Sequence, residues 1–365
     1  MNSKIKKKKI KFKKGFKLGV LVFLIVIIIL TIIYLLTPVS SSDKEEIVTI
    51  KSGTSTSEIA TILKDKKLIK SKTFFTIYSK IKRAKYYAAS YKLSPNMSLN
   101  EIINELQTTG NDIDEIAITI KEGQNMRQIA KLISENTNIK YDDIIKKSKD
   151  QKYLDKLINK YWFIEKDIKN INLYYNLEGY LFPDTYEFAN KDVSVDAIIT
   201  TLLNEFNKKV SPYKEEIENS DYNIHELITL ASIAESESLP GADRKKVVSV
   251  SINRMKSGMS LGSDMTAYYA YKLDDYSNGG LTLEQFNDCS SPYNTRCSTK
   301  MGLPIGPISN PSLDSIVGAI EYEETTYLYY VADCSGVTYF TNTYNEFINK
   351  INELQQQEKW CEVSK

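Results

Sequence analysis

The stretch IHELITLASIAESES at residues 224–238 determines how the larger part of the chain can fold. Its apolar residues recur on nearly every side of a helix, and a Pro-Gly pair at 240–241 stops it. Such a helix is stable only when other elements surround it. We therefore predict a central, buried helix within an α+β domain that occupies residues 171–365.

Two glutamates lie near the end of this predicted helix. Glu235 and Glu237 are two positions apart and point to different faces, so they do not form the facing carboxylate pair of most glycosidases. Apolar surroundings and the negative end of the helix dipole both raise the pKa of a glutamate placed there, which suits a general acid. A basic neighbour, Arg244 or Arg254, would instead neutralise Glu235. From the residues alone both interpretations stay open.

The segments on either side of the helix are rich in aromatic residues, glycine and proline. LEGYLFPDTYEF at 177–188 combines rings with carboxylates, as a carbohydrate cleft does, although a packed corner of the core has the same composition. A second helix is predicted at 243–256. The loops SPYNT at 291–295 and GLPIGPISNP at 302–311 contain the fixed turns that often wall a cleft.

Charge is distributed unevenly, although 48 Lys and Arg against 46 Asp and Glu give a net charge of only +2. Nine lysines and no acid lie within residues 1–17, so the remaining chain is acidic. This argues against a nucleic-acid partner, which requires a clustered positive surface. The single histidine, His225, argues against a His-rich metal site or a Ser-His-Asp triad. We predict neither a metal nor a cofactor.

Residues 18–36 read LGVLVFLIVIIILTIIYLL and carry no charge. At 1.5 Å per residue they span roughly 30 Å, the thickness of the hydrocarbon layer. We predict a single transmembrane helix with the basic tail 1–17 in the cytoplasm and the rest of the chain outside. The alternatives are a cleaved signal peptide, whose apolar region is usually shorter, and a buried core helix, which needs no lysines on one side.

A linker at 37–46 precedes two copies of one pattern. VTIKSG at 48–53 and ITIKEG at 118–123 each read as a strand and a glycine turn, and an amphipathic helix follows each. This internal repeat within 47–140 resembles LysM-like modules, which bind N-acetylated sugar chains, although a generic small α/β module has the same pattern. Residues 141–170 are predicted to form a helical connector.

All four cysteines lie in the last quarter of the chain, outside the membrane on the predicted topology. An oxidising compartment permits disulfides, and a bond between Cys289 and Cys297 would close a short loop, so we favour this pair. Free thiols are the alternative. Zinc is not indicated because no CxxC spacing occurs.

Six motifs, taken in order, are similar to those of the YceG-like family of endolytic murein transglycosylases. They are LEGYLFPDTYEF (177–188), LASIAESES (230–238), INRMKSGMSLGSDMT (252–266), SPYNT (291–295), GLPIGPISNP (302–311) and YLYYVAD (327–333). The chain departs from the family with Asp264-Met265-Thr266 in place of Asp-Pro-Thr. It also has Thr338-Tyr339 where a Gly-His pair commonly precedes the final Phe, which puts a C-terminal histidine's role in doubt.

The resemblance implies cleavage of the β-1,4 bond between N-acetylmuramic acid and N-acetylglucosamine without water. Glu235, the first glutamate of its motif, is implied as the single catalytic acid. It protonates the leaving O4, then accepts the O6 proton as O6 attacks C1, which gives a 1,6-anhydro end. Candidates for binding the substrate or stabilising the positive charge are Glu178, Glu237, Asn253, Asp264, Thr266, Tyr293 and Asn294.

These implications place the protein in a bacterial cell membrane, with its catalytic domain outside and glycan strands of peptidoglycan as its substrate. Penicillin-binding proteins or other wall-synthesis proteins are candidate partners. Two other functions stay open, a non-catalytic glycan-binding scaffold and a muramidase that uses water. The products distinguish them, since a muramidase leaves reducing ends and a scaffold cleaves nothing.

Overall fold

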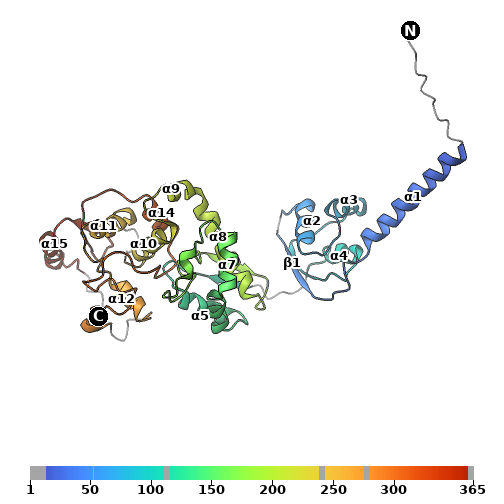
Figure 1. Ribbon diagram of the computed structural model, residues 1–365. Coiled ribbons are helices and arrows are strands. Elements are labelled where there is room, and N and C mark those ends of the chain that lie inside the picture. The colour runs from blue at the N-terminus through green and yellow to red at the C-terminus, as the bar shows by residue number, and fades with distance from the viewer. Residues whose placement is uncertain (1–13, 52, 111–115, 238–242, 275–279, 361–365) are drawn as a thin grey trace, which may run out of the picture. The chain divides into compact units, whose positions relative to one another are not determined.

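The computed structural model describes residues 14–51, 53–110, 116–237, 243–274 and 280–360 (Figure 1). Within these residues, helices are combined with three two-stranded antiparallel sheets, so the predicted α+β class is confirmed. The chain forms two compact units, Met1–Asp114 and Glu115–Lys365.

The first unit contains a long helix and a small α/β module. Its elements are, in order, α1 (Lys14–Leu36), β1 (Glu46–Ile50), α2 (Thr56–Asp65), α3 (Lys72–Lys82), β2 (Ala89–Leu93) and α4 (Leu99–Glu105). β1 and β2 pair with Val48 opposite Tyr91, and their inward side chains form one core with apolar residues of α2, α3 and α4. Capping boxes at Ser55 and Ser98 start α2 and α4 by pairing the first free backbone N–H groups.

Helix α1 exposes its side chains from Leu21 to Tyr34. In the described part of the chain, no helix is both long enough and apolar enough to cross a membrane. The transmembrane helix predicted at 18–36 is therefore not found there.

The second copy of the repeat belongs to the second unit. This unit begins with β3 (Ile116–Thr119), α5 (Met126–Asn136), α6 (Tyr141–Ser148), α7 (Gln151–Lys160), η1 (Lys166–Lys169) and β4 (Thr185–Phe188). β3 pairs with β4, where Ile118 lies opposite Tyr186. From the sequence we predicted that both copies lie in one region, 47–140. The structure places them in different units, because β3 of the second copy hydrogen-bonds to β4, the strand at the end of the 177–188 motif. The predicted connector at 141–170 is helical, and its apolar side chains join the core of this unit.

The rest of the second unit is mainly helical. Its elements are α8 (Val195–Val210), η2 (Ser211–Tyr213), α9 (Lys214–Glu218), α10 (Ile224–Glu237), α11 (Arg244–Lys256), α12 (Asp264–Ala270), α13 (Leu283–Phe286), α14 (Leu313–Ile320), β5 (Tyr329–Ala332), β6 (Thr338–Thr341) and α15 (Tyr344–Gln356). α11 corresponds to the helix predicted at 243–256, with Asp243 as its N-cap.

Helix α10 is the centre of this unit, as its sequence predicts. Ten of its 14 residues are buried, and it packs against α11, α12 and α14. Asn223 and Glu226 cap its start through reciprocal hydrogen bonds of 2.9 Å. The C-terminal end of α10 is therefore held from several sides, and this end carries the two glutamates.

Candidate active site

The last turn of α10 places three consecutive residues in three different surroundings. Glu235 lies against the start of α14, Ser236 lines a small pocket, and Glu237 lines a larger one. Successive helical residues are rotated by about 100°, which explains why one turn of α10 contributes to all three.

Hydrogen-bond donors surround Glu235. Its Oε2 accepts hydrogen bonds from the backbone N of Ser312 (3.0 Å), the Ser312 hydroxyl (2.5 Å) and the Ser315 hydroxyl (2.7 Å). Its Oε1 lies 3.5 Å from Nη2 of Arg244, and only 8% of the side chain is exposed. Hydrogen bonds from Ser312 and Ser315 and the ion pair with Arg244 therefore hold the Glu235 side chain in place. Of the two basic neighbours considered from the sequence, Arg244 is the one beside it.

Glu237 occupies a different environment on the neighbouring face. The Ser263 hydroxyl donates to its Oε1, and the backbone N of Met265 and the Tyr330 hydroxyl lie 3.5 Å from its carboxylate oxygens. Burial raises the pKa of Glu237, while the hydrogen bond from Ser263 opposes the rise and the nearby Asp264 adds to it. A carboxyl of this kind holds its proton to higher pH than an exposed glutamate.

The pocket around Glu237 has a volume of about 330 Å³. Aromatic side chains of β5 and α15 line one part of it, and the rings of Tyr329 and Phe347 stack with centroids 5.6 Å apart. Two arginines line another part. Arg254 donates to the carbonyl of Leu328 (2.7 Å), while Nε of Arg296 lies 3.1 Å from Asp264. Rings, guanidinium groups and a buried carboxyl group together suit a polar, ring-shaped ligand with anionic substituents.

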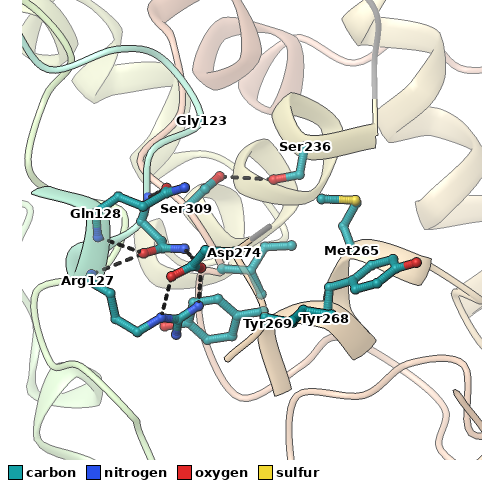
Figure 2. A pocket seen from close by; sticks show the side chains of 12 residues that line it. Gly123, Arg127, Gln128, Ser236, Met265, Tyr268, Tyr269, Asp274 and Ser309 are labelled. Atoms are coloured by element: carbon teal, nitrogen blue, oxygen red, sulfur yellow. Dashed lines mark hydrogen bonds and ion pairs between the residues drawn. The ribbon is translucent and has the colours of Figure 1, made fainter. Parts of the chain in front are cut away.

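The smaller pocket, about 60 Å³, lies beside Ser236 (Figure 2). Figure 2 shows Arg127 of α5 in a bidentate ion pair with Asp274, and the hydroxyl groups of Ser236 and Ser309 facing each other. The two hydroxyl oxygens are 3.1 Å apart. Met265 lines this pocket, and its backbone N also approaches Glu237. The two pockets are therefore neighbours along the end of α10.

Glu178, a predicted binding residue, lies in the interior. Its carboxylate accepts hydrogen bonds from the backbone N of Met126 (2.9 Å), the Tyr269 hydroxyl (2.9 Å) and the Asn310 amide (2.9 Å). Burial raises its pKa to about 7, although the bonds from Met126 and Tyr269 oppose the rise. Next to it, Gly179 has a φ of +89°, and a Cβ there would lie 2.7 Å from Pro307. Glu178 thus joins α5, α12 and the 302–311 loop rather than lining a pocket.

Four other predicted binding residues also bond to the protein itself: Asn253, Thr266, Tyr293 and Asn294. The amide of Asn294, for example, donates to the carbonyls of Phe286 (3.0 Å) and Asp288 (2.8 Å). All of them except the half-buried Asn253 are buried. They hold loops in place around the pockets, whereas Glu237 and Asp264 both line the larger pocket.

Cys289 and Cys297, the pair favoured from the sequence, are joined by a disulfide with their Cα atoms 5.3 Å apart. The bond closes the loop that contains SPYNT, and Arg296 directly precedes its second cysteine. Within the described residues, no three His, Cys, Asp or Glu side chains are grouped so that they could hold a metal ion.

Several residues of the site were not predicted, namely Ser312, Ser315, Tyr330 and Arg296. Two of them leave a signal in the sequence. Ser312 directly precedes the apolar helix LDSIVGAI, a typical N-cap position, and Tyr330 lies within the YLYYVAD motif. Their contacts with the glutamates of α10 join residues far apart in the chain, so no local sequence pattern predicts them.

The sequence matches known proteins over most of its length. Residues 48–353 match the model of the YceG-like family. An endolytic murein transglycosylase of Bacillus subtilis (strain 168) is 37% identical over 322 residues, which are 87% of each chain. One of Streptococcus pneumoniae serotype 2 (strain D39 / NCTC 7466) is 29% identical over 87% of this chain and 60% of its own length. A crystal structure of a putative YceG-like protein from Listeria monocytogenes superimposes with a TM-score of 0.59 at 32% identity, covering 85% of this chain and all of that one.

Proposed function

We infer that this chain, which belongs to the YceG-like family, is an endolytic murein transglycosylase. The enzyme cleaves glycan strands of peptidoglycan internally and forms 1,6-anhydro-muramoyl ends. What supports this activity within the chain itself is the pocket at the end of α10, where a buried carboxyl group meets aromatic and guanidinium side chains.

We assign the role of the acid to Glu237, whereas the sequence motif pointed to Glu235. Proton donation requires a carboxyl that is protonated before the substrate reacts. Burial raises the pKa of Glu237, which lies in the pocket large enough for a sugar ring. Glu235 is instead held by Ser312, Ser315 and Arg244, all of which donate to it. Its carboxylate fixes the start of α14 against the end of α10.

The reaction then needs only one carboxyl group. Protonated Glu237 donates to the glycosidic O4 as the C1–O4 bond breaks, which leaves positive charge at C1. The muramoyl O6 attacks C1, and its proton returns to Glu237, so no water is consumed. The Ser263 and Tyr330 hydroxyls lie where they stabilise the carboxylate between the two steps. Burial raises the pKa of Glu237, whereas these hydrogen bonds lower it. This balance suits a group that must donate a proton in the first step and accept one in the second.

Asp264 and Arg296 are the next candidates for contact with the substrate. Asp264 lines the same pocket as Glu237, and its negative charge favours an oxocarbenium-like centre. The Arg296 side chain is 43% exposed, so its guanidinium is accessible to the anionic groups of a muramoyl peptide.

Product analysis on polymeric peptidoglycan tests the activity. The full chain should release fragments with 1,6-anhydro-muramoyl ends, which lack one water relative to the hydrolysed product and are about 18 Da lighter. Fragments with reducing ends would identify a water-using muramidase instead. If the chain bound the glycan without cleaving it, the scaffold alternative would replace the enzyme.

We further propose that the catalytic unit acts outside the cytoplasm of a bacterial cell, at the cell membrane. Nine lysines before an apolar segment and the location of murein support this. A reporter fused after Lys365 should be active only outside the cytoplasm. Glycan binding by LysM-like modules, and penicillin-binding proteins or other wall-synthesis proteins as partners, stay predictions.

A further inference from the structure

The first unit carries a dense positive surface that runs from the end of α2 through α3 to the residues after it. Residues 64–85 contain nine Lys or Arg residues and one acid, Asp65. Eight of the nine are exposed, and Lys70 is half-buried. Two ion pairs offset part of this charge, between Lys66 and Glu46 (4.0 Å) and between Lys72 and Asp65 (3.6 Å). A strong positive field therefore remains over α3 and the residues that follow it.

Apolar side chains are exposed within the same surface. Helix α3 buries Phe75 and Ser79 against the core, while Ile77 and Ile81 point away from it, 52% and 72% exposed. These two isoleucines are four residues apart, so they lie on one outward face of α3. Lys80 lies beside them on that face, and Lys82, Arg83 and Lys85 follow. Large apolar side chains among lysines are typical of helices that lie in the interface between water and lipid.

This surface adjoins the end of α1. The Lys70 ammonium donates to the Tyr34 carbonyl (2.7 Å) and the Thr37 hydroxyl (2.8 Å), and it lies 4.0 Å above the Tyr34 ring. From Leu21 to Tyr34, α1 exposes apolar side chains. The positive surface and the exposed apolar helix α1 are therefore in contact within one unit. The contact is made by Lys70 of the surface and Tyr34 of α1.

We propose that the outward face of α3, with Ile77, Ile81 and the lysines around them, docks onto a bilayer surface rich in anionic phospholipids. The lysines would bind the headgroup phosphates, and the two isoleucines would enter the boundary of the acyl chains. A water-soluble phosphate polymer would form the same ion pairs with the lysines, but it offers no apolar environment for the two isoleucines. The combination of both kinds of side chain therefore favours lipid.

An environment-sensitive fluorophore placed on the full chain tests this contact. The dye nitrobenzoxadiazole is attached to the Ile81→Cys variant, with the unsubstituted protein labelled in parallel as background. Vesicles of phosphatidylglycerol and phosphatidylcholine should shift its emission to the blue, while pure phosphatidylcholine vesicles should not. High salt should reverse the shift, because it screens the lysines. The same dye at Ile171→Cys is the matched control, since Ile171 is a 94% exposed isoleucine of the second unit.

Charge reversal identifies the side chains responsible. The variant Lys80→Glu, Lys82→Glu, Lys85→Glu should need roughly a hundredfold more anionic lipid for the same shift, since each of the three basic residues contributes roughly fivefold to binding near such a surface. Reversal of three exposed lysines of the second unit, Lys140, Lys152 and Lys156, should leave the shift unchanged. Circular dichroism verifies folding, and lysine-to-glutamine changes replace any unfolded variant.

Three results would overturn the proposal. The first is an equal shift at Ile81 in neutral and anionic vesicles, and the second is a shift that survives charge reversal on α3. The third is the same shift on addition of soluble poly(glycerol phosphate) without lipid, which would identify a phosphate polymer as the partner. Murein cleavage in detergent should be unaffected by the α3 variants, so this test is independent of the proposed enzymatic activity.

Discussion

The two copies of the strand–glycine–helix pattern begin alike and end in different surroundings. In the first copy β1 pairs with β2 inside the small unit, whereas in the second β3 pairs with β4 inside the catalytic unit. Gly53 and Gly123 both have a positive φ, +82° and +76°. A Cβ at Gly53 would meet nothing within 4 Å, but one at Gly123 would lie 3.7 Å from Glu235. The same local pattern thus gives the same local structure, and only tertiary pairing makes the second copy part of the active site.

The helix starts differ in the same way. Ser55 caps α2 through a capping box with Glu58, and both residues are exposed. Asn125 caps α5 in the same manner, but its amide also donates to Asp274 (2.6 Å), and the next backbone N–H is bound by Glu178. The second copy is therefore coupled to a buried carboxyl group, that of Glu178, which the first copy lacks at the corresponding helix start. This difference gives each unit its own response to pH and mutation.

The largest expected difference is in pH dependence. Burial raises the pKa of Glu178 to about 7, so between the ordinary pKa of a glutamate and pH 7 the folded second unit binds more protons than the unfolded one. Stability is then lost as the pH rises through this window, by roughly 3 kcal/mol in total. Glu178→Gln should remove that dependence. Denaturant titrations of both proteins at pH 4.5, 6 and 8 measure it.

Parallel stability curves for wild type and Glu178→Gln would contradict this expectation. Glu58 provides the control with the opposite sign. The backbone N–H of Ser55 lowers the pKa of Glu58, so its contribution is present above the ordinary pKa and is lost as the pH falls through the lowered value. Hydrogen exchange, read separately for each unit, should show the first unit weakening in acid and the second weakening toward neutral pH.

A matched pair of glycine substitutions should distinguish the effect of backbone strain on stability from the effect of active-site geometry on the rate of cleavage. Leucine at Gly53 or Gly123 forces an L-residue into the left-handed region, at about 1 kcal/mol in each copy. Gly123 also lines the pocket beside Ser236, so Gly123→Leu should lower murein cleavage about tenfold or more. Gly53→Leu should leave cleavage intact. Equal activities in two folded variants would show that the second copy does not shape the site.

The smallest expected difference between the two copies, about 1 kcal/mol, comes from their N-caps. Ser55→Ala removes one cap from an exposed helix start and should cost about 1 kcal/mol of the first unit's stability. Asn125→Ala removes a cap together with the bond to Asp274, so about 2 kcal/mol is expected in the second unit. Thermal unfolding measures both. A larger loss for Ser55→Ala would mean that the coupling of Asn125 to Asp274 adds nothing.

The elements whose patterns are local could be predicted from the sequence. All-round apolarity predicted the burial of α10, and the short spacing of Cys289 and Cys297 favoured the observed disulfide. The division of the repeat between two units could not be predicted, because β3 and β4 are joined by hydrogen bonds between residues far apart in the chain. Apart from Arg244, the partners of Glu235 and Glu237 come from the start of α14 with its N-cap Ser312, from β5 and from the 263–265 segment, and they could not be predicted for the same reason.

The different roles of the two glutamates depend on those long-range partners. Glu237→Gln and Glu235→Gln keep the size of the side chain but cannot donate a carboxyl proton. If Glu237 is the acid, Glu237→Gln stays folded and forms anhydro-muramoyl ends roughly 10²–10⁴-fold more slowly. Glu235→Gln leaves part of its donor set unsatisfied, which lowers stability by about 1–3 kcal/mol, but it keeps substantial activity.

The most direct measurement is the rate at which these two variants release anhydro-ended fragments from polymeric peptidoglycan, compared with wild type at equal folded concentration. We predict near-complete loss for Glu237→Gln and a smaller loss for Glu235→Gln. The reverse order, with Glu237→Gln close to wild type and Glu235→Gln inactive although folded, would contradict the assignment and return the role of the acid to Glu235.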